Sequence, residues 1–147
     1  MNEIEGTENA MEKILESLKA RYDAIGKHLF APVQYLRWAE TPQHDGSPHI
    51  EYEGNQFIYV VTERGRRYGE KRTTDPEELL YWLVSDVTRA MASDFERTHR
   101  HETEDSRRQL FAKHLDLLES VNSEWAYRKR AEYAEILRQY PYQDPTE

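Results

Sequence analysis

The longest apolar pattern in the chain runs from Asp75 to Arg100 and has the spacing of a helix. Its apolar members recur at steps of three and four: Leu80, Leu83, Val84, Val87, Met91 and Phe95. Asp75 can accept hydrogen bonds from the first free amides of such a helix, and Pro76 fits its first turn. Leu79 and Trp82 widen the apolar surface beyond one stripe. We therefore predict a long helix in the middle of the core.

A second apolar stripe lies near the start of the chain, after an acidic lead that ends at about Glu8. Its members alternate steps of four and three: Met11, Leu15, Leu18, Tyr22, Ile25 and Leu29. This spacing predicts one amphipathic helix. Its apolar side must be buried, and packing against the chain's own core can bury it. The stripe is at the short limit for a coiled coil, so a monomer and a weak homodimer both remain open.

The segment 30–48 has no clear period, because Pro32, Pro42, Gly46 and Pro48 interrupt it. A helical and an extended conformation both remain open for Val33 to Trp38.

Alternation and turn residues then predict a small sheet. His49 to Glu53 alternates in character, Gly54 and Asn55 are turn residues, and Phe57 to Thr62 is rich in aromatic and β-branched types. These features predict a hairpin. A second turn at Glu63 to Gly65 returns Arg66 to Thr74 as a third, mostly polar strand at an edge of the sheet.

Helical spacing restarts after His101. Leu110 to Val121 predicts a third helix, and Asn122 or Ser123 can cap a fourth that carries Trp125 and ends before Pro141. We expect Trp82 and Trp125 to be core residues. The fold class is therefore α+β: an N-terminal helix, a three-stranded antiparallel meander, then a long central helix and two further C-terminal helices.

The length of 147 residues suits one domain spanning 1–147, with loosely ordered ends at 1–8 and 142–147. The chain has no cysteine, which excludes a disulfide framework and a cysteine nucleophile. It has no apolar run of about 18 residues and no secretory pattern at its start, so we expect a soluble, cytoplasmic protein that does not enter a membrane.

The balance of 28 acidic against 20 basic residues gives a formal net charge of -8. Such a charge opposes attraction to a phosphate backbone, so we expect no nucleic-acid partner and favour a basic protein partner. A local basic cluster fits a solvated edge strand that discourages aggregation. Its members are Arg64, Arg66, Arg67, Lys71 and Arg72.

The sequence contains no GxxxxGK[ST], GxGxxG, HExxH or GxSxG pattern. The region richest in candidate chemistry is 94–105, with Asp94, Glu96, His99, His101, Glu102, Glu104 and Asp105. Such groups could bind a divalent metal or transfer protons. Because arginines interleave with these acids, a surface of mutually paired charges is the favoured interpretation. We expect no cofactor, no metal and no enzyme activity, and keep a metal enzyme using 94–105 as the less favoured alternative.

Several stretches between about His49 and Asp144 resemble the immunity protein 63 family of bacterial polymorphic toxin systems. They are Tyr59-Val60-Val61-Thr62-Glu63-Arg64-Gly65, Arg72-Thr73-Thr74-Asp75, Glu78-Leu79-Leu80-Tyr81-Trp82, Asp86-Val87-Thr88, Glu124-Trp125-Ala126 and Tyr140-Pro141. The resemblance implies an antidote that binds a cognate toxin domain and blocks it, without chemistry of its own. A generic acidic interaction or regulatory module is the alternative.

The acidic balance of the chain fits a toxin with a basic surface, such as a nuclease. Exposed acids where the central helix ends could supply charge, and aromatic residues of the hairpin could supply anchors. The candidate toxin-binding residues are therefore Asp94, Glu96, Glu102, Glu104, Asp105, Tyr52 and Tyr59.

Overall fold

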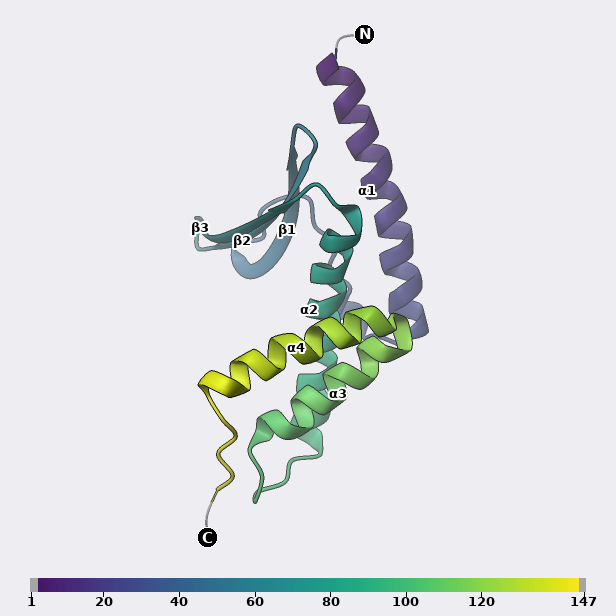
Figure 1. Ribbon diagram of the computed structural model, residues 1–147. Helices are drawn as coiled ribbons and strands as arrows, with labels where there is room; N and C mark the ends of the chain where they lie inside the picture. Colours follow the sequence, from purple (N-terminus) through teal and green to yellow (C-terminus); the bar gives the residue numbers. More distant parts are fainter. Residues whose placement is uncertain (1–2, 146–147) are drawn as a thin grey trace. The chain divides into compact units, whose positions relative to one another are not determined.

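The computed structural model describes residues 3–145, without the side chains of Glu3 and Ile4. Its elements are α1 (Glu3–His28), a 3-10 turn (Val33–Tyr35), β1 (Asp45–Glu53), β2 (Gln56–Glu63), β3 (Arg66–Thr73), α2 (Pro76–Thr98), α3 (Ser106–Val121) and α4 (Ser123–Gln139) (Figure 1). The predicted α+β order of one helix, three strands and three helices is confirmed. None of the helices in this part of the chain is both long and apolar enough to cross a membrane.

The described residues form two compact units. The first unit comprises Met1–His28 and Leu36–Leu83, and the second comprises Leu29–Tyr35 and Val84–Glu147. Helix α2 begins in the first unit and ends in the second. That the whole chain 1–147 behaves as one domain stays a prediction.

In the first unit the three strands form the predicted antiparallel meander in the order β1-β2-β3. Gly54 begins the β1–β2 turn with φ +60°, and the β2–β3 turn has positive φ at both Arg64 and Gly65 (+51° and +80°), as primed hairpin turns require. The register of β2 and β3 shifts between Val61 and Thr62, which leaves Tyr68 as a bulge on the exposed edge strand. Such a bulge discourages edge pairing with another chain.

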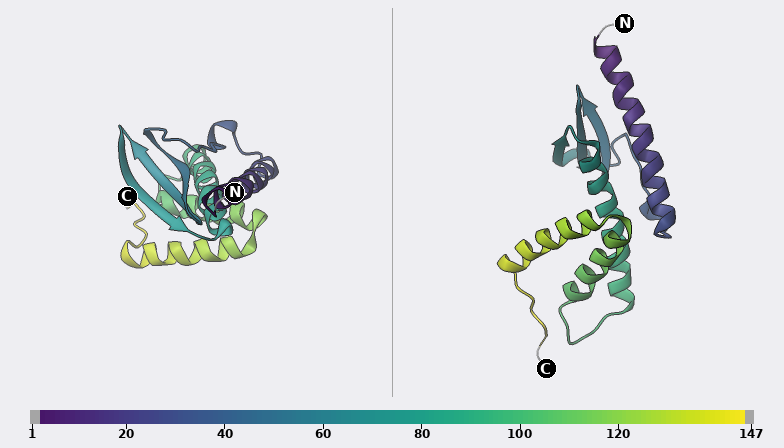
Figure 2. Two further views of the ribbon diagram at one scale, coloured as in Figure 1. Left: turned by 90° about the horizontal axis from the view of Figure 1, so that it is seen from above. Right: turned by 45° about the vertical axis from the view of Figure 1, so that its right-hand side comes forward.

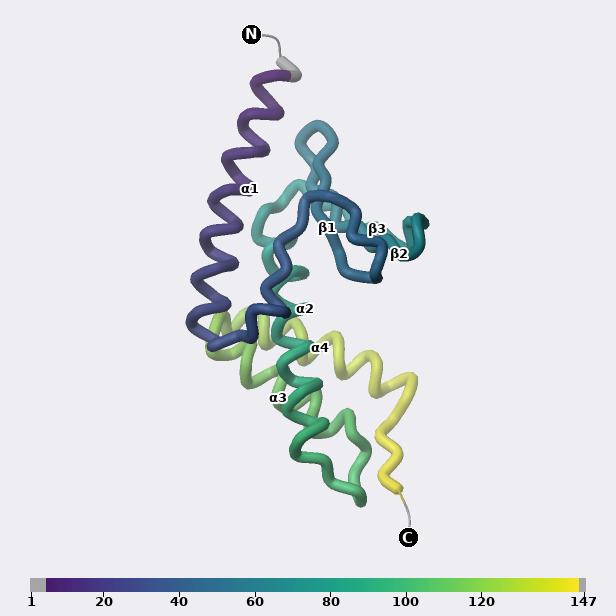
Figure 3. Tube along the Cα trace, turned by 180° about the vertical axis from the view of Figure 1, so that it is seen from behind, coloured from purple at the N-terminus to yellow at the C-terminus, as the bar shows by residue number. Residues whose placement is uncertain are grey.

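The core of the first unit lies between α1, one face of the sheet and the start of α2. Helix α1 runs beside the strands, and the β1–β2 turn lies next to its N-terminal half (Figures 1 and 3). The buried apolar residues of this core include Met11, Leu15, Leu18, Tyr22, Ile50, Phe57, Tyr59, Leu79, Leu80 and Tyr81. The apolar stripe of α1 is therefore covered within the chain itself.

Helix α2 begins with the cap that the sequence predicts at Asp75. The Asp75 carboxylate accepts a hydrogen bond from the Glu77 amide at 2.9 Å, which satisfies one of the free donors at the helix start. Glu77 also forms a two-pronged ion pair with Arg21 of α1. That pair fastens the first turn of α2 to α1 within the first unit.

The second unit contains the rest of α2 with α3 and α4, which lie side by side (Figure 2). Its buried residues include Val84, Val87, Ala92, Phe111, His114, Leu118, Trp125, Ala126 and Tyr133. Asn122 joins the two last helices: its amide donates to the Leu118 carbonyl, and its side chain accepts from the amides of Glu124 and Trp125. One residue thus ends α3 and begins α4.

The segment that the sequence left open contains one short 3-10 turn, Val33–Tyr35, followed by irregular chain, and β1 begins at Asp45 rather than at His49. Of the ends expected to be loosely ordered, residues 1–2 and 146–147 lie outside the described residues. Helix α1 already begins at Glu3. Near the C-terminal end, the Asp144 carboxylate accepts a hydrogen bond from the Asp105 amide at 2.8 Å and forms an ion pair with Arg108 at 2.9 Å.

Candidate functional site

Three of the five candidate acids at the end of α2 and the start of α3 have partners within their own unit. The Asp94 carboxylate accepts a hydrogen bond from the Tyr35 hydroxyl and forms an ion pair with Arg97. Glu96 is 5% exposed, and Arg100 donates to its two oxygens at 3.0 and 3.1 Å. This guanidinium lowers the pKa of Glu96.

Asp105 caps the N-terminus of α3. Its carboxylate accepts from the amides of Arg107 at 3.0 Å and Gln143 at 2.9 Å and also pairs with the Arg107 side chain. Hydrogen bonds from the Arg107 side chain, followed by the Gln143 amide, hold the pKa of Asp105 well below its usual range. Asp94, Glu96 and Asp105 thus each hold local structure together.

Glu102 and Glu104 are exposed in the segment between α2 and α3. The nearby His99 ring stacks on Phe95 at a centroid distance of 4.1 Å. Within residues 3–145, no three histidine, aspartate or glutamate side chains gather closely enough to hold a metal ion. The region 94–105 is therefore a charged helix end whose solvent-facing acids are Glu102 and Glu104.

The two candidate tyrosines have different surroundings in the first unit. Tyr59 is 9% exposed and meets the Trp82 ring edge-on at 5.9 Å. The Lys71 ammonium lies 4.7 Å from the centroids of both rings, so this tyrosine packs within a cation–aromatic cluster. Tyr52 is half-buried, and its hydroxyl donates to Glu12 of α1 at 3.3 Å.

Tyr52 lines an acidic hollow of about 280 Å³ beside α1. The lining residues are Glu12, Leu15, Glu16, Lys19, Glu40 and Tyr52. Burial raises the pKa of the Tyr52 hydroxyl, and the charges of Glu12, Glu8 and Glu40 raise it further. A concentration of negative charge therefore surrounds this tyrosine.

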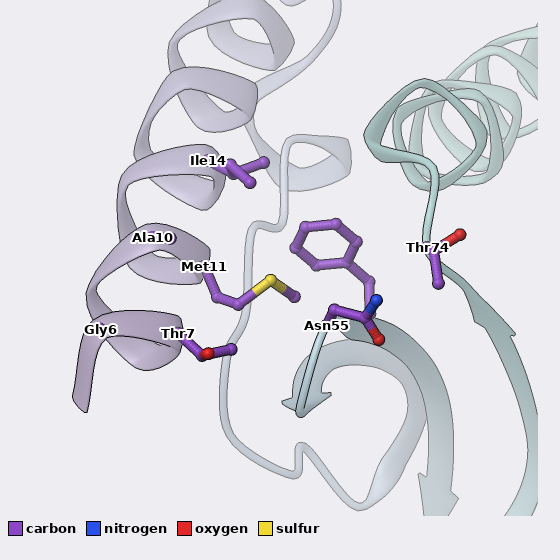
Figure 4. A pocket seen from close by; sticks show the side chains of 8 residues that line it. Gly6, Thr7, Ala10, Met11, Ile14, Asn55 and Thr74 are labelled. Carbon is purple, nitrogen blue, oxygen red and sulfur yellow. The ribbon is translucent and has the colours of Figure 1, made fainter. Parts of the chain in front are cut away.

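A larger, mostly apolar groove of about 610 Å³ opens between the N-terminal part of α1 and the β1–β2 turn. Its lining residues are Gly6, Thr7, Ala10, Met11, Ile14, Asn55, Phe57 and Thr74. Figure 4 shows the residues of α1 on one wall, with Asn55 and Thr74 across the groove. Met11 and Phe57 are 4% and 1% exposed and form its floor.

The groove and the acidic hollow are neighbours on the sheet. Tyr52 of the hollow is the direct cross-strand partner of Phe57 of the groove, and Glu12 of the hollow follows Met11 of the groove along α1. Sequence reasoning missed this surface because its walls lie about 45 residues apart in the chain. One signal was readable: Glu8, Glu12 and Glu16 recur every fourth residue, which places them along one side of α1.

The second unit contains a buried polar chain at the junction of its three helices. The Thr88 hydroxyl donates to the Val84 carbonyl at 2.8 Å and lies 2.7 Å from His114 Nε2. Nε2–H is then the donor to Thr88, and Nδ1 accepts from the Tyr133 hydroxyl. Burial, and then the charges of Lys129 and Arg89, lower the pKa of His114 from 6.5 to about 3. This histidine is a neutral structural group at pH 7.

Comparison with known families matches residues 53–135 to the family described as Immunity protein 63. The matched residues begin at the last position of β1 and end within α4, so they leave out α1. Neither a curated protein nor a solved structure matches the chain.

Proposed function

The chain belongs to the immunity protein 63 family, and from this premise we propose that it is an antidote in a bacterial polymorphic toxin system that neutralises a cognate toxin by binding it directly. The family match over residues 53–135 carries the proposal. In this account the protein performs no reaction. It acts through the surface that it presents to the toxin.

The charge of the chain supports a basic toxin, such as a nuclease. A formal net charge of -8 attracts a positively charged partner over distances of about 10 Å at moderate ionic strength. Attraction of this kind accelerates encounter and discriminates against acidic partners. The affinity for the toxin should therefore fall as salt is added.

Glu102 and Glu104 support the predicted contact region at the end of α2, because they are exposed. Tyr52 supports the predicted hairpin contact, because it borders the acidic hollow. Roles in binding for Asp94, Glu96, Asp105 and Tyr59 stay predictions. Their partners within the chain imply that substitutions there would disturb the fold as well as any contact.

We place this activity in the cytoplasm, where an antidote protects the cell that makes it, and we propose that the chain acts as a monomer. The apolar stripe of α1 is covered within its own unit, so folding of that unit does not require a second copy.

Co-expression tests the proposed function. The proposed function expects the gene immediately upstream of the gene for this chain to encode the toxin, and the C-terminal domain of that product is induced in cells with and without the chain. Growth should stop without the chain and resume with it, and the two proteins should co-purify. An unrelated acidic protein of similar size is the control for non-specific charge effects. If the chain neither co-purifies with the toxin domain nor restores growth, the proposed function is wrong.

A further inference from the structure

We propose that the groove between the N-terminal half of α1 and the β1–β2 turn, together with the adjoining acidic hollow, is the docking surface for the cognate toxin. The occupant is an apolar side chain of the toxin that lies among lysines and arginines. This inference rests on the proposed function and adds the location and chemistry of the contact.

The groove suits an anchoring side chain. Its volume of about 610 Å³ falls in the range of ligand-binding clefts, about 300–1,000 Å³. Gly6 and Ala10 are small residues on the α1 wall, so they leave the space between helix and turn open. Met11 on the floor has a flexible thioether side chain that can adjust to a bound group.

The adjoining charges select the partner. Glu8, Glu12 and Glu16 follow one side of α1, and Glu40 and Tyr52 complete the hollow. Lys19 is the cation that lines it. An apolar centre with a charged margin has the anatomy of a protein–protein interface. A partner that matches it must carry apolar surface inside a basic margin.

A second copy of this chain fits the surface less well. In a twofold symmetric dimer the same patch faces itself. The glutamates of one copy would then lie close to those of the other, which costs binding free energy. A basic toxin surface instead neutralises these carboxylates, so the charge pattern favours a heterologous partner.

Filling the groove tests the anchor. Ala10 is exposed and lines the groove, whereas Ala20 is exposed on the same helix and lines none of the hollows described above. The variants Ala10→Trp and Ala20→Trp therefore carry the same substitution in and away from the groove. The probe is an inactive variant of the C-terminal domain encoded by the upstream gene, which the proposed function expects to be the toxin. We expect Ala10→Trp to weaken its binding by at least about tenfold, mainly through faster dissociation, and Ala20→Trp to bind as the wild type does.

Reversing the rim charge tests the choice of partner. Glu8→Lys with Glu16→Lys should slow association with the toxin domain by about tenfold at low salt and reduce the salt dependence. Asp116→Lys with Glu119→Lys, at two exposed positions of α3, changes the net charge by the same amount and is the matched control. Circular dichroism of each variant identifies any loss of fold, and Ala10→Arg serves as a second groove variant if Ala10→Trp does not fold.

The outcomes separate this inference from the proposed function. If the wild type binds the toxin domain and both the groove and the rim variants bind equally well, the docking surface lies elsewhere and the proposed function stands. If the wild type does not bind, both are wrong. If light scattering shows a dimer that Ala10→Trp dissociates while toxin binding is unchanged, the groove serves a second copy and the inference is overturned.

Discussion

At the scale of single residues, His114 has the clearest energetic role in the second unit. It is 1% exposed and links Thr88 of α2 to Tyr133 of α4 through its two ring nitrogens. Protonation of the ring would remove the acceptor at Nδ1 that binds the Tyr133 hydroxyl, and the new positive charge would lie close to Lys129 and Arg89. The folded state therefore resists protonation of this ring.

Acid should accordingly weaken the fold. The pKa of His114 is about 3 in the folded state, compared with 6.5 as the ordinary value, so between these values the unfolded chain binds the proton and the folded chain does not. The free energy of unfolding should then fall as pH falls below about 6.5, by about 1.5 kcal/mol between pH 6.5 and pH 5. Urea unfolding at several pH values measures this.

The carboxylates with lowered pKa, such as Asp105 and Glu96, add a further loss at lower pH, because they must be protonated as the chain unfolds. The window above pH 5 therefore avoids these carboxylates, and comparison with a His114 variant identifies the contribution of this histidine. His114→Gln should be less stable at pH 7 and should show a flatter pH profile in that window. An unchanged profile would show that His114 is not the titrating group.

Asn122 provides a second residue-level test. Its side chain accepts from the Glu124 and Trp125 amides at 2.9 and 3.2 Å. Asn122→Ala should lower the free energy of unfolding by about 1 kcal/mol, measured by chemical denaturation. Asn122→Asp, which keeps an acceptor oxygen, should lose much less. Equal losses in the two variants would show that the cap contributes nothing.

At the scale of elements, local patterns in the sequence predicted most of the fold. Asp75 and Pro76 marked the start of α2 correctly, since capping depends on neighbouring residues alone. Gly54 and Asn55 marked the hairpin turn for the same reason. The helical character of 3–8 was not visible, because this acidic stretch has one apolar side chain, that of Ile4, and a single apolar position defines no period.

The candidate site was less predictable. Partners three and four residues away, such as Arg97 for Asp94 and Arg100 for Glu96, follow from helix geometry. The contact of Tyr35 with Asp94 spans 59 positions and could not be read locally. The groove could not be read locally either, because its two walls, α1 and the hairpin turn, are brought together only by the tertiary fold.

The segment between α2 and α3 gives an element-level prediction. Glu102 and Glu104 are exposed, so reversing both to lysine should leave the fold intact. If this segment contributes to attraction of a basic toxin, association should slow severalfold at low salt and recover at high salt. Stopped-flow fluorescence measures the rate. No change at low salt would remove these two acids from the binding account.

At the scale of the whole molecule, the two compact units share α2. We expect this continuous helix to couple their unfolding into one cooperative transition. Trp38 and Trp82 lie in the first unit and Trp125 in the second, so tryptophan fluorescence can follow each unit separately. Trp125→Phe reports the first unit, and the double variant Trp38→Phe with Trp82→Phe reports the second.

Each reporter transition should coincide with the far-ultraviolet circular dichroism transition of the same variant. Two separated transitions within one variant would show that the units unfold independently, and the chain would then be two domains rather than one.

The central claim is that this chain neutralises a toxin by binding it. Calorimetric titration tests this most directly, with the purified chain titrated into an inactive variant of the C-terminal domain encoded by the upstream gene, which the account expects to be the toxin. The account predicts a saturable one-to-one complex with a Kd below about 1 µM that weakens as salt is added. The absence of any saturable binding at low salt would contradict it.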